Sequence, residues 1–231
     1  MSTNSVARFG GNAAILVGLS YVAVLVSALL MPPELKGGAA TEHEFWLALS
    51  RNPTAHLMLH WSWVAGGIVA LAAIPAISHP VRSLSEGWVG FATALAYLGY
   101  AVNARSHLME VAWDRKVLPV YETADAAYQQ AVHVVAALAL DVPDGFLTHG
   151  GIGFWMVVIS VLALRHRIFP MSLGYIGLGV ALLNWITVVG FVLMTERHPI
   201  GLSLITLGWG GGSILGAIWF IGLGFRLRTS R

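Results

Sequence analysis

The chain of 231 residues holds 13 Lys or Arg and 11 Asp or Glu, so charged residues make up only 10 % of it, against about 25 % in an ordinary soluble domain. Hydrophobic residues reach 57 % and gather in blocks of about 18 to 25 residues, each long enough to cross ~30 Å of hydrocarbon as a helix. These figures exclude most water-soluble folds and predict an integral membrane protein. The absence of cysteine excludes disulfides, thiolate metal sites and iron–sulfur clusters, and a formal net charge of +2 gives no argument for a nucleic-acid partner.

Six apolar segments are predicted to span the membrane. We expect helices because isolated strands cannot pair their backbone polar groups in lipid, and the short alternating segments that build a barrel are absent. In chain order the spans are 13–31, 54–78, 87–113, 147–164, 171–195 and 201–224. The first lacks a small-x-small cleavage site, so we interpret it as a retained helix. The predicted fold class is all-α, a single six-helix transmembrane domain over residues 1–231.

The basic residues predict the orientation. If the N-terminus lies inside, the only carboxylate on the inner side is Glu86, and the short inner connections are rich in arginine. This is the charge distribution that the positive-inside rule describes, so both termini are predicted to be cytoplasmic. The inner cations are Arg8, Arg82, Arg165, Arg167, Arg226, Arg228 and Arg231.

Two outer segments, 32–53 and 114–146, are predicted to contain short interfacial helices. In the first, Thr41 followed three residues later by Glu44 forms a capping box, and Asn52-Pro53 ends that helix and starts the second span. In the second, the run from Thr123 to Leu140 has no helix breaker and is too short to cross the membrane. We expect an interfacial or partly re-entrant helix over the mouth of the bundle, stopped by Asp141-Val142-Pro143-Asp144-Gly145.

Most of the nine histidines fall at the outer side of the predicted topology. His56 and His60 are four residues apart near the outer start of the second span, so their imidazoles share one helix face. His107 and Glu110 are three apart near the outer end of the third span, and His149 begins the fourth. Groups from three helices at similar depth predict one shared site, with the ligands His56, His60, His107, Glu110 and His149.

The third predicted span strengthens this hypothesis. Polar residues recur along it at intervals of three or four and form one stripe, which must face protein or water because it cannot face lipid. Asn103 and Tyr100, about one and two turns from His107, are predicted to surround the ligands with hydrogen-bonding groups. Asn184, midway along the fifth span, could complete a lined cavity or simply join helices. The stripe consists of Thr93, Tyr97, Tyr100, Asn103, His107, Glu110 and Asp114.

Imidazoles with a carboxylate favour Zn, Cu or non-haem Fe over Ca or Mg. Haem b is the alternative cofactor, with His60 and either His149 or His107 as axial ligands. A third interpretation is a hydrogen-bonded network that only fixes how the helices pack. The other histidines are interpreted as interfacial anchors; they are His43, His79, His166 and His198, and also His133.

The sixth span contains Gly208 and Gly212 at small-x-x-x-small spacing, which lets helix backbones approach closely. Besides the lipid bilayer, the predicted partners are therefore a second copy or a larger membrane complex that docks on this helix. The first functional hypothesis is a membrane metalloenzyme or redox protein. The alternatives are a non-catalytic subunit or scaffold, and a small-molecule transporter, for which three spans in each half leave an inverted repeat open.

The connection between the fourth and fifth spans reads Leu164-Arg165-His166-Arg167-Ile168-Phe169-Pro170, and then Met171-Ser172-Leu173-Gly174-Tyr175-Ile176-Gly177. This basic turn, proline and Gly-rich helix start resemble a connection common in uncharacterised bacterial multi-pass integral membrane proteins. The resemblance covers about a fifth of the chain, residues 146–193. It implies a bacterial cytoplasmic (inner) membrane location and carries no functional residues over to this chain.

Overall fold

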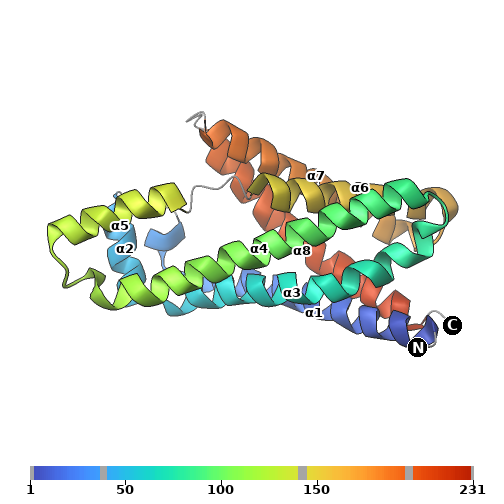
Figure 1. Ribbon diagram of the computed structural model, residues 1–231, viewed down its shortest axis with the longest axis horizontal. Helices are drawn as coiled ribbons and strands as arrows, with labels where there is room; N and C mark the ends of the chain where they lie inside the picture. Colours follow the sequence, from blue (N-terminus) through green and yellow to red (C-terminus); the bar gives the residue numbers. More distant parts are fainter. Residues whose placement is uncertain (1–2, 37–40, 140–144, 196–199, 230–231) are drawn as a thin grey trace.

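The computed structural model describes residues 3–36, 41–139, 145–195 and 200–229, and within these ranges every regular element is helical (Figure 1). Arg197, His198, Arg231 and the expected stop at Asp141 to Asp144 lie outside the described residues. The elements are α1 Thr3–Leu30, η1 Pro33–Lys36, α2 Glu42–Arg51, α3 Thr54–Arg82, α4 Glu86–Tyr121, α5 Ala126–Ala139, η2 Phe146–Gly150, α6 Gly151–His166, α7 Met171–Thr195 and α8 Gly201–Thr229.

Each predicted span is a helix, and α3 and α7 begin at the expected residues, Thr54 and Met171. Five of the helices in the described part of the chain are long and apolar enough to cross a membrane, which is the architecture of a multi-pass membrane protein. They are the segments Ala7–Leu30, Thr54–Arg82, Phe146–His166, Met171–Met194 and Gly201–Thr229. The long helix α4 is not among them, because it carries the charged and polar residues of the stripe.

Six helices form a closed ring. Its neighbours follow in the order α1, α3, α4, α6, α7 and α8, and α8 packs back against α1. The beginning of α1 and the end of α8 lie at the same end of the bundle (Figure 1). Because the ring closes on itself, each helix has one face inside the protein and one face outside it.

The part of the ring nearer the start of α1 and the end of α8, which we call the inner end, is filled by aromatic side chains. Trp155 and Trp219 pack edge to face with ring centroids 5.6 Å apart, and Phe220 lies 4.9 Å from Trp219. The one polar atom of Trp155 is satisfied, since its Nε1 donates to Ser78 Oγ at 3.0 Å. Thr93 donates to the same oxygen at 3.0 Å. The Trp155 indole is therefore held in this core by a hydrogen bond from its one polar atom.

Glycines set how closely the helices approach. A Cβ added to Gly224 on α8 would lie 2.6 Å from the carbonyl oxygen of Gly11 on α1, and Gly208 faces Thr187 and the Leu183 carbonyl of α7 at similarly short range. The expected close approach at Gly208 is thus made with α7 inside the same chain. Gly210, by contrast, has no atom within 4 Å of its added Cβ.

The outer end extends beyond the ring. Helix α4 is 36 residues long, which corresponds to about 54 Å at 1.5 Å per residue, and it continues to Tyr121 rather than ending near 113. Its last turns form a second small core with α2 and α5, made by Trp46, Leu49, Val117, Leu118, Tyr121 and Val132. Helix α5 consequently runs back beside the end of α4 and along the bundle axis, instead of lying across the mouth of the bundle (Figure 1).

The start of α2 confirms the predicted cap, because the N–H of Glu44 donates to Thr41 Oγ1 at 3.2 Å. Asn52 follows the last residue of α2, and Pro53 precedes the first residue of α3, as the sequence predicts. This tight connection places the outer end of α3 directly beside the second core.

The glycine contacts give a first test. Gly224→Ala should destabilise the protein by ~1–3 kcal/mol, because the added methyl group meets backbone that cannot rotate away. The matched control on the same helix is Gly210→Ala, which we expect to be neutral or to stabilise by up to ~1 kcal/mol through helix propensity. Thermal unfolding in detergent measures both; equal effects would contradict close α1–α8 packing.

Candidate metal centre

Polar side chains of α3 and α4 meet near the outer ends of these two helices, which are joined by a short turn and run antiparallel (Figure 1). On α3, the rings of His56 and His60 lie 4.3 Å apart, as expected for residues four apart on one face. Facing them on α4 are His107, Glu110 and Asp114, which are spaced by three and four residues. The two helices therefore present complementary ligand stripes to each other.

His60 is the centre of this group. Its Nδ1 lies 2.9 Å from Nδ1 of His107, and its Nε2 lies 3.9 Å from Oε2 of Glu110. One turn further out, His56 Nε2 lies 3.3 Å from Asp114 Oδ2. All three contacts keep the same antiparallel register, so the cluster also fixes how α3 and α4 align.

The His60–His107 contact joins two ring nitrogens, so one carries a hydrogen and the other a lone pair. When His60 donates from Nδ1, its Nε2 is unprotonated and faces Glu110. That is the tautomer of a metal-binding imidazole, whose second nitrogen donates to a neighbouring acceptor. His107 can therefore act as the group that orients His60.

His56, His60 and Glu110 could hold a metal ion, because one ligand atom from each lies within 4.8 Å of the other two. Ligands of a tetrahedral ion at ~2.1 Å stand about 3.4 Å apart, so small side-chain rotations would close the group. His60 is buried, whereas His56 and Glu110 are half-buried. The group is thus shielded on one side and reachable from the other.

Asp114 lies next to this group, and only 2 % of its side chain is exposed. Its Oδ2 accepts no hydrogen bond from any residue that the structure describes, and the His56 imidazole is the neighbour at 3.3 Å. A buried carboxylate is costly unless positive charge or hydrogen bonds compensate it. A cation held through His56 would provide that charge.

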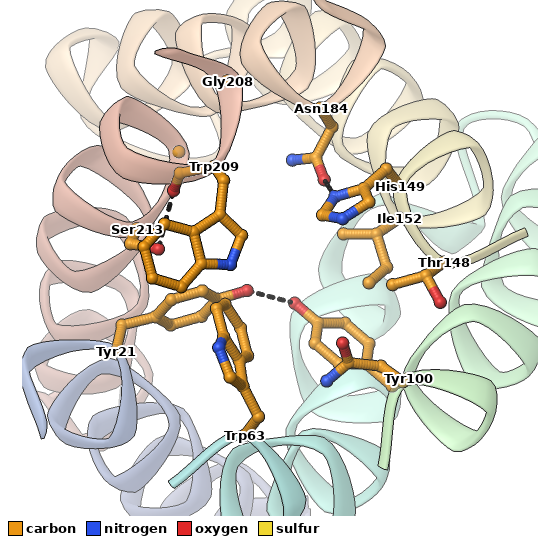
Figure 2. Close-up of a pocket in the computed structure, with 12 residues that line it drawn as sticks. Tyr21, Trp63, Tyr100, Thr148, His149, Ile152, Asn184, Gly208, Trp209 and Ser213 are labelled. Atoms are coloured by element: carbon orange, nitrogen blue, oxygen red, sulfur yellow. Dashed lines mark hydrogen bonds between the residues drawn. The ribbon is translucent and has the colours of Figure 1, made fainter. Parts of the chain in front are cut away.

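One turn deeper than His60, the ring encloses a cavity to which all six of its helices contribute (Figure 2). Trp63 separates the cavity from the metal group, and its ring is stacked on His107 at 5.7 Å. The space available to the centres of water-sized molecules is about 20 Å³. The residues that line it come from all sides of the ring and include Tyr21, Trp63, Asn103, His149, Asn184 and Trp209.

The structure divides the predicted ligands between these two places. His56, His60, His107 and Glu110 come together, whereas His149 lines the cavity and contacts Asn184 Oδ1 through its Nδ1 at 3.0 Å. The haem alternative needs His60 to face His149 or His107 across a porphyrin. His60 contacts His107 directly instead, and the cavity beside His149 is far too small for a porphyrin.

The two residues expected around the ligands lie deeper than predicted. Tyr100 is buried, and its hydroxyl lies 3.5 Å from that of Tyr21 on α1. Asn103 lines the cavity, and its Nδ2 has no hydrogen-bond partner in the described part of the chain. Tyr97, which the sequence placed in the same stripe, is 36 % exposed.

Sequence reasoning missed two members of the site. Asp114 was recognised in the polar stripe but not as a partner of the ligands, although its position four residues after Glu110 puts it on the same face. Trp63 was not predicted to belong to the site, yet it is buried against His107. Its position three residues after His60 was the signal that could have found it.

A second histidine cluster joins the three helices of the outer end. The Tyr121 hydroxyl lies 2.7 Å from His133 Nε2 and 3.1 Å from His43 Nδ1, and His133 Nδ1 lies 3.7 Å from a Glu42 oxygen. Burial and the Glu42 carboxylate raise the pKa of Tyr121, so the phenol stays protonated and can donate to one imidazole while accepting from the other. His43 and His133 therefore link α2 and α5 to α4.

An ion pair at the surface connects the end of α2 with the residue that follows α4. Arg51 Nη2 lies 2.6 Å from Glu122 Oε1, and this hydrogen bond lowers the pKa of Glu122. A lowered carboxyl pKa means that the contribution is present at neutral pH and is lost as the pH falls through that pKa. Both side chains are about half exposed, so solvent screens the interaction.

The chain matches no protein-family model, no curated protein and no solved structure.

The outer histidine cluster gives a test of local stability. Tyr121→Phe removes a buried hydroxyl that contacts two imidazoles, so it should destabilise the outer end by ~1–3 kcal/mol. Tyr128→Phe, on the exposed side of α5, is the control and should change stability by less than ~0.5 kcal/mol. Hydrogen exchange of α5 amides reports the difference, and unchanged protection in Tyr121→Phe would rule out the linking role.

Proposed function

We propose that this chain is a six-span membrane protein that binds one transition-metal ion through His56, His60 and Glu110 and uses it for redox or hydrolytic chemistry at the outer mouth of the bundle. The observation that carries the proposal is the convergence of these three ligand atoms from two helices. His107 and Asp114 support it, because each contacts a ligand and can orient it. In this proposal α4 is the sixth span, and both termini are cytoplasmic.

Two imidazoles and one carboxylate have two established uses in proteins. With Zn they leave a fourth position open for water or substrate, as hydrolytic zinc enzymes require. With non-haem Fe(II) the same set leaves open positions for oxygen chemistry. In both cases the two packed helices α3 and α4 hold the ligands. The half-buried Glu110 lies on the side of the group that remains accessible.

The charges of the site favour a divalent cation. Neutral imidazoles with Glu110 and the buried Asp114 carry up to two negative charges in a poorly solvated region. A divalent ion compensates both carboxylates, whereas a network without metal compensates Asp114 only if His56, 3.3 Å away, is protonated. This difference favours the metal over the interpretation of a purely structural histidine network.

Metal analysis of purified protein tests the site directly. The wild type should carry about one equivalent of Zn, Fe or Cu, and His60→Ala or Glu110→Gln should lose most of it. His79→Ala is the matched control, because His79 is an exposed histidine at the opposite end of the same helix. Metal-free wild-type protein that does not take up Zn²⁺ or Co²⁺ on titration would sink the proposal.

The orienting residues make a graded prediction. His107→Ala and Asp114→Asn keep all three ligands but remove the groups that orient His60 and His56, so each should weaken Co²⁺ binding by ~10–100-fold. The Co²⁺ absorption spectrum checks whether the remaining ligands still bind. An affinity unchanged in both variants would mean that neither residue supports the ligands.

A further inference from the structure

The cavity beneath the metal centre contains two buried N–H donors without partners. Trp63 Nε1 and Asn103 Nδ2 have no hydrogen bond to any described residue, and the two side chains are only 8 % and 7 % exposed. Both residues line the cavity. A buried donor that stays unpaired is expensive, so two in one cavity indicate that something there accepts hydrogen bonds.

The opposite wall of the cavity presents an acceptor. Asn184 Nδ2 donates to the Val180 carbonyl at 2.9 Å, so Asn184 Oδ1 is the atom that faces His149 Nδ1 at 3.0 Å. An amide oxygen can only accept, so Nδ1 of His149 carries the hydrogen. The neutral ring then has its lone pair on Nε2, and Figure 2 shows this ring at the edge of the cavity.

Two tyrosine hydroxyls at the cavity are only loosely paired. Those of Tyr21 and Tyr100 stand 3.5 Å apart across the cavity (Figure 2), longer than the ~2.7–2.8 Å of a usual O–H···O bond. They hold at most one of their two hydrogens between them. The cavity thus offers more hydrogen-bonding groups than its own side chains use.

Size and charge define what can fill the cavity. About 20 Å³ is open to the centres of water-sized molecules, which exceeds the ~10–15 Å³ that one water needs and is too little for a larger ligand. Among the described residues that line the cavity there is no Asp, Glu, Lys or Arg, so an ion is disfavoured. Water, which is neutral and both accepts and donates hydrogen bonds, fits these limits.

We propose that this cavity is a binding site for water, which accepts hydrogen bonds from Asn103 Nδ2 and Trp63 Nε1 and donates one to His149 Nε2. The bound water would be held inside the ring at the depth of the lipid, one helical turn from the metal centre. Its donors Trp63 and Asn103 lie on α3 and α4, the helices that carry the ligands, and its acceptor His149 lies on η2. None of the three is one of the proposed metal ligands His56, His60 and Glu110, so the site does not require a bound metal. His149 becomes the one base in direct contact with this water.

The sign of a stability change tests the proposal. If water is bound, Asn103 is satisfied, and Asn103→Leu should lower the Tm by ~2–4 °C or more, as for the loss of one buried hydrogen bond. The control is Ser160→Ala, since Ser160 Oγ is also buried without a partner but does not line the cavity. That variant should leave the Tm unchanged or raise it. A Tm that rises in Asn103→Leu as well would mean that the cavity is dry.

A spectroscopic measurement on folded protein gives an independent answer. In ¹⁵N-histidine-labelled protein, the unprotonated Nε2 of His149 should show the shift of a hydrogen-bonded lone pair and an exchange contact to water, and both should disappear in Asn103→Leu. The same signature should persist in metal-free His60→Ala, which separates this site from the metal centre. A free lone pair in the wild type would overturn the water site while leaving the metal proposal intact.

Discussion

Hydrocarbon cannot hydrogen-bond, so a polar side chain at the depth of the spans needs a partner within the protein or in bound water. The contact that meets this constraint most directly is the 2.9 Å pair of His60 and His107. Together with Glu110 and Asp114 it fixes one antiparallel register between α3 and α4. A shift of α4 by one residue would turn its whole stripe away from α3, because neighbouring helical residues face directions about 100° apart.

The closed ring arranges the interior in layers along its axis. At the inner end, aromatic residues such as Trp155 and Trp219 form a core in which the Trp155 Nε1 is hydrogen-bonded to Ser78. Above it lies the small cavity, then the His60 group, and finally the outer core where Tyr121 joins two imidazoles. Polarity increases from the closed end to the open end, so the side chains that could bind a metal are concentrated near the outer ends of α3 and α4.

The ends of helices that continue beyond their apolar segments are the part of the fold that the sequence predicted least well. Apolar composition marks the part of a helix that contacts hydrocarbon, and it predicted Thr54 and Met171 as starting residues correctly. Backbone hydrogen bonding does not stop at the lipid boundary, so α4 continues to Tyr121 although its apolar run ends near 113. That continuation provides the surface on which α2 and α5 pack, which no local pattern in 114–146 could reveal.

The sequence by itself determined the all-helical membrane architecture and the pairing of ligands within a helix, because both follow from composition and from the 3.6-residue repeat. It placed His56 with His60, and His107 with Glu110, for this reason. Only the tertiary structure decided which helices meet: α3 and α4 bring those two pairs together, while His149 on η2 turns to Asn184 on the neighbouring helix α7. The physical reason is that depth along a span can be read from residue number, whereas the direction in which a helix face points depends on the packing of all six helices.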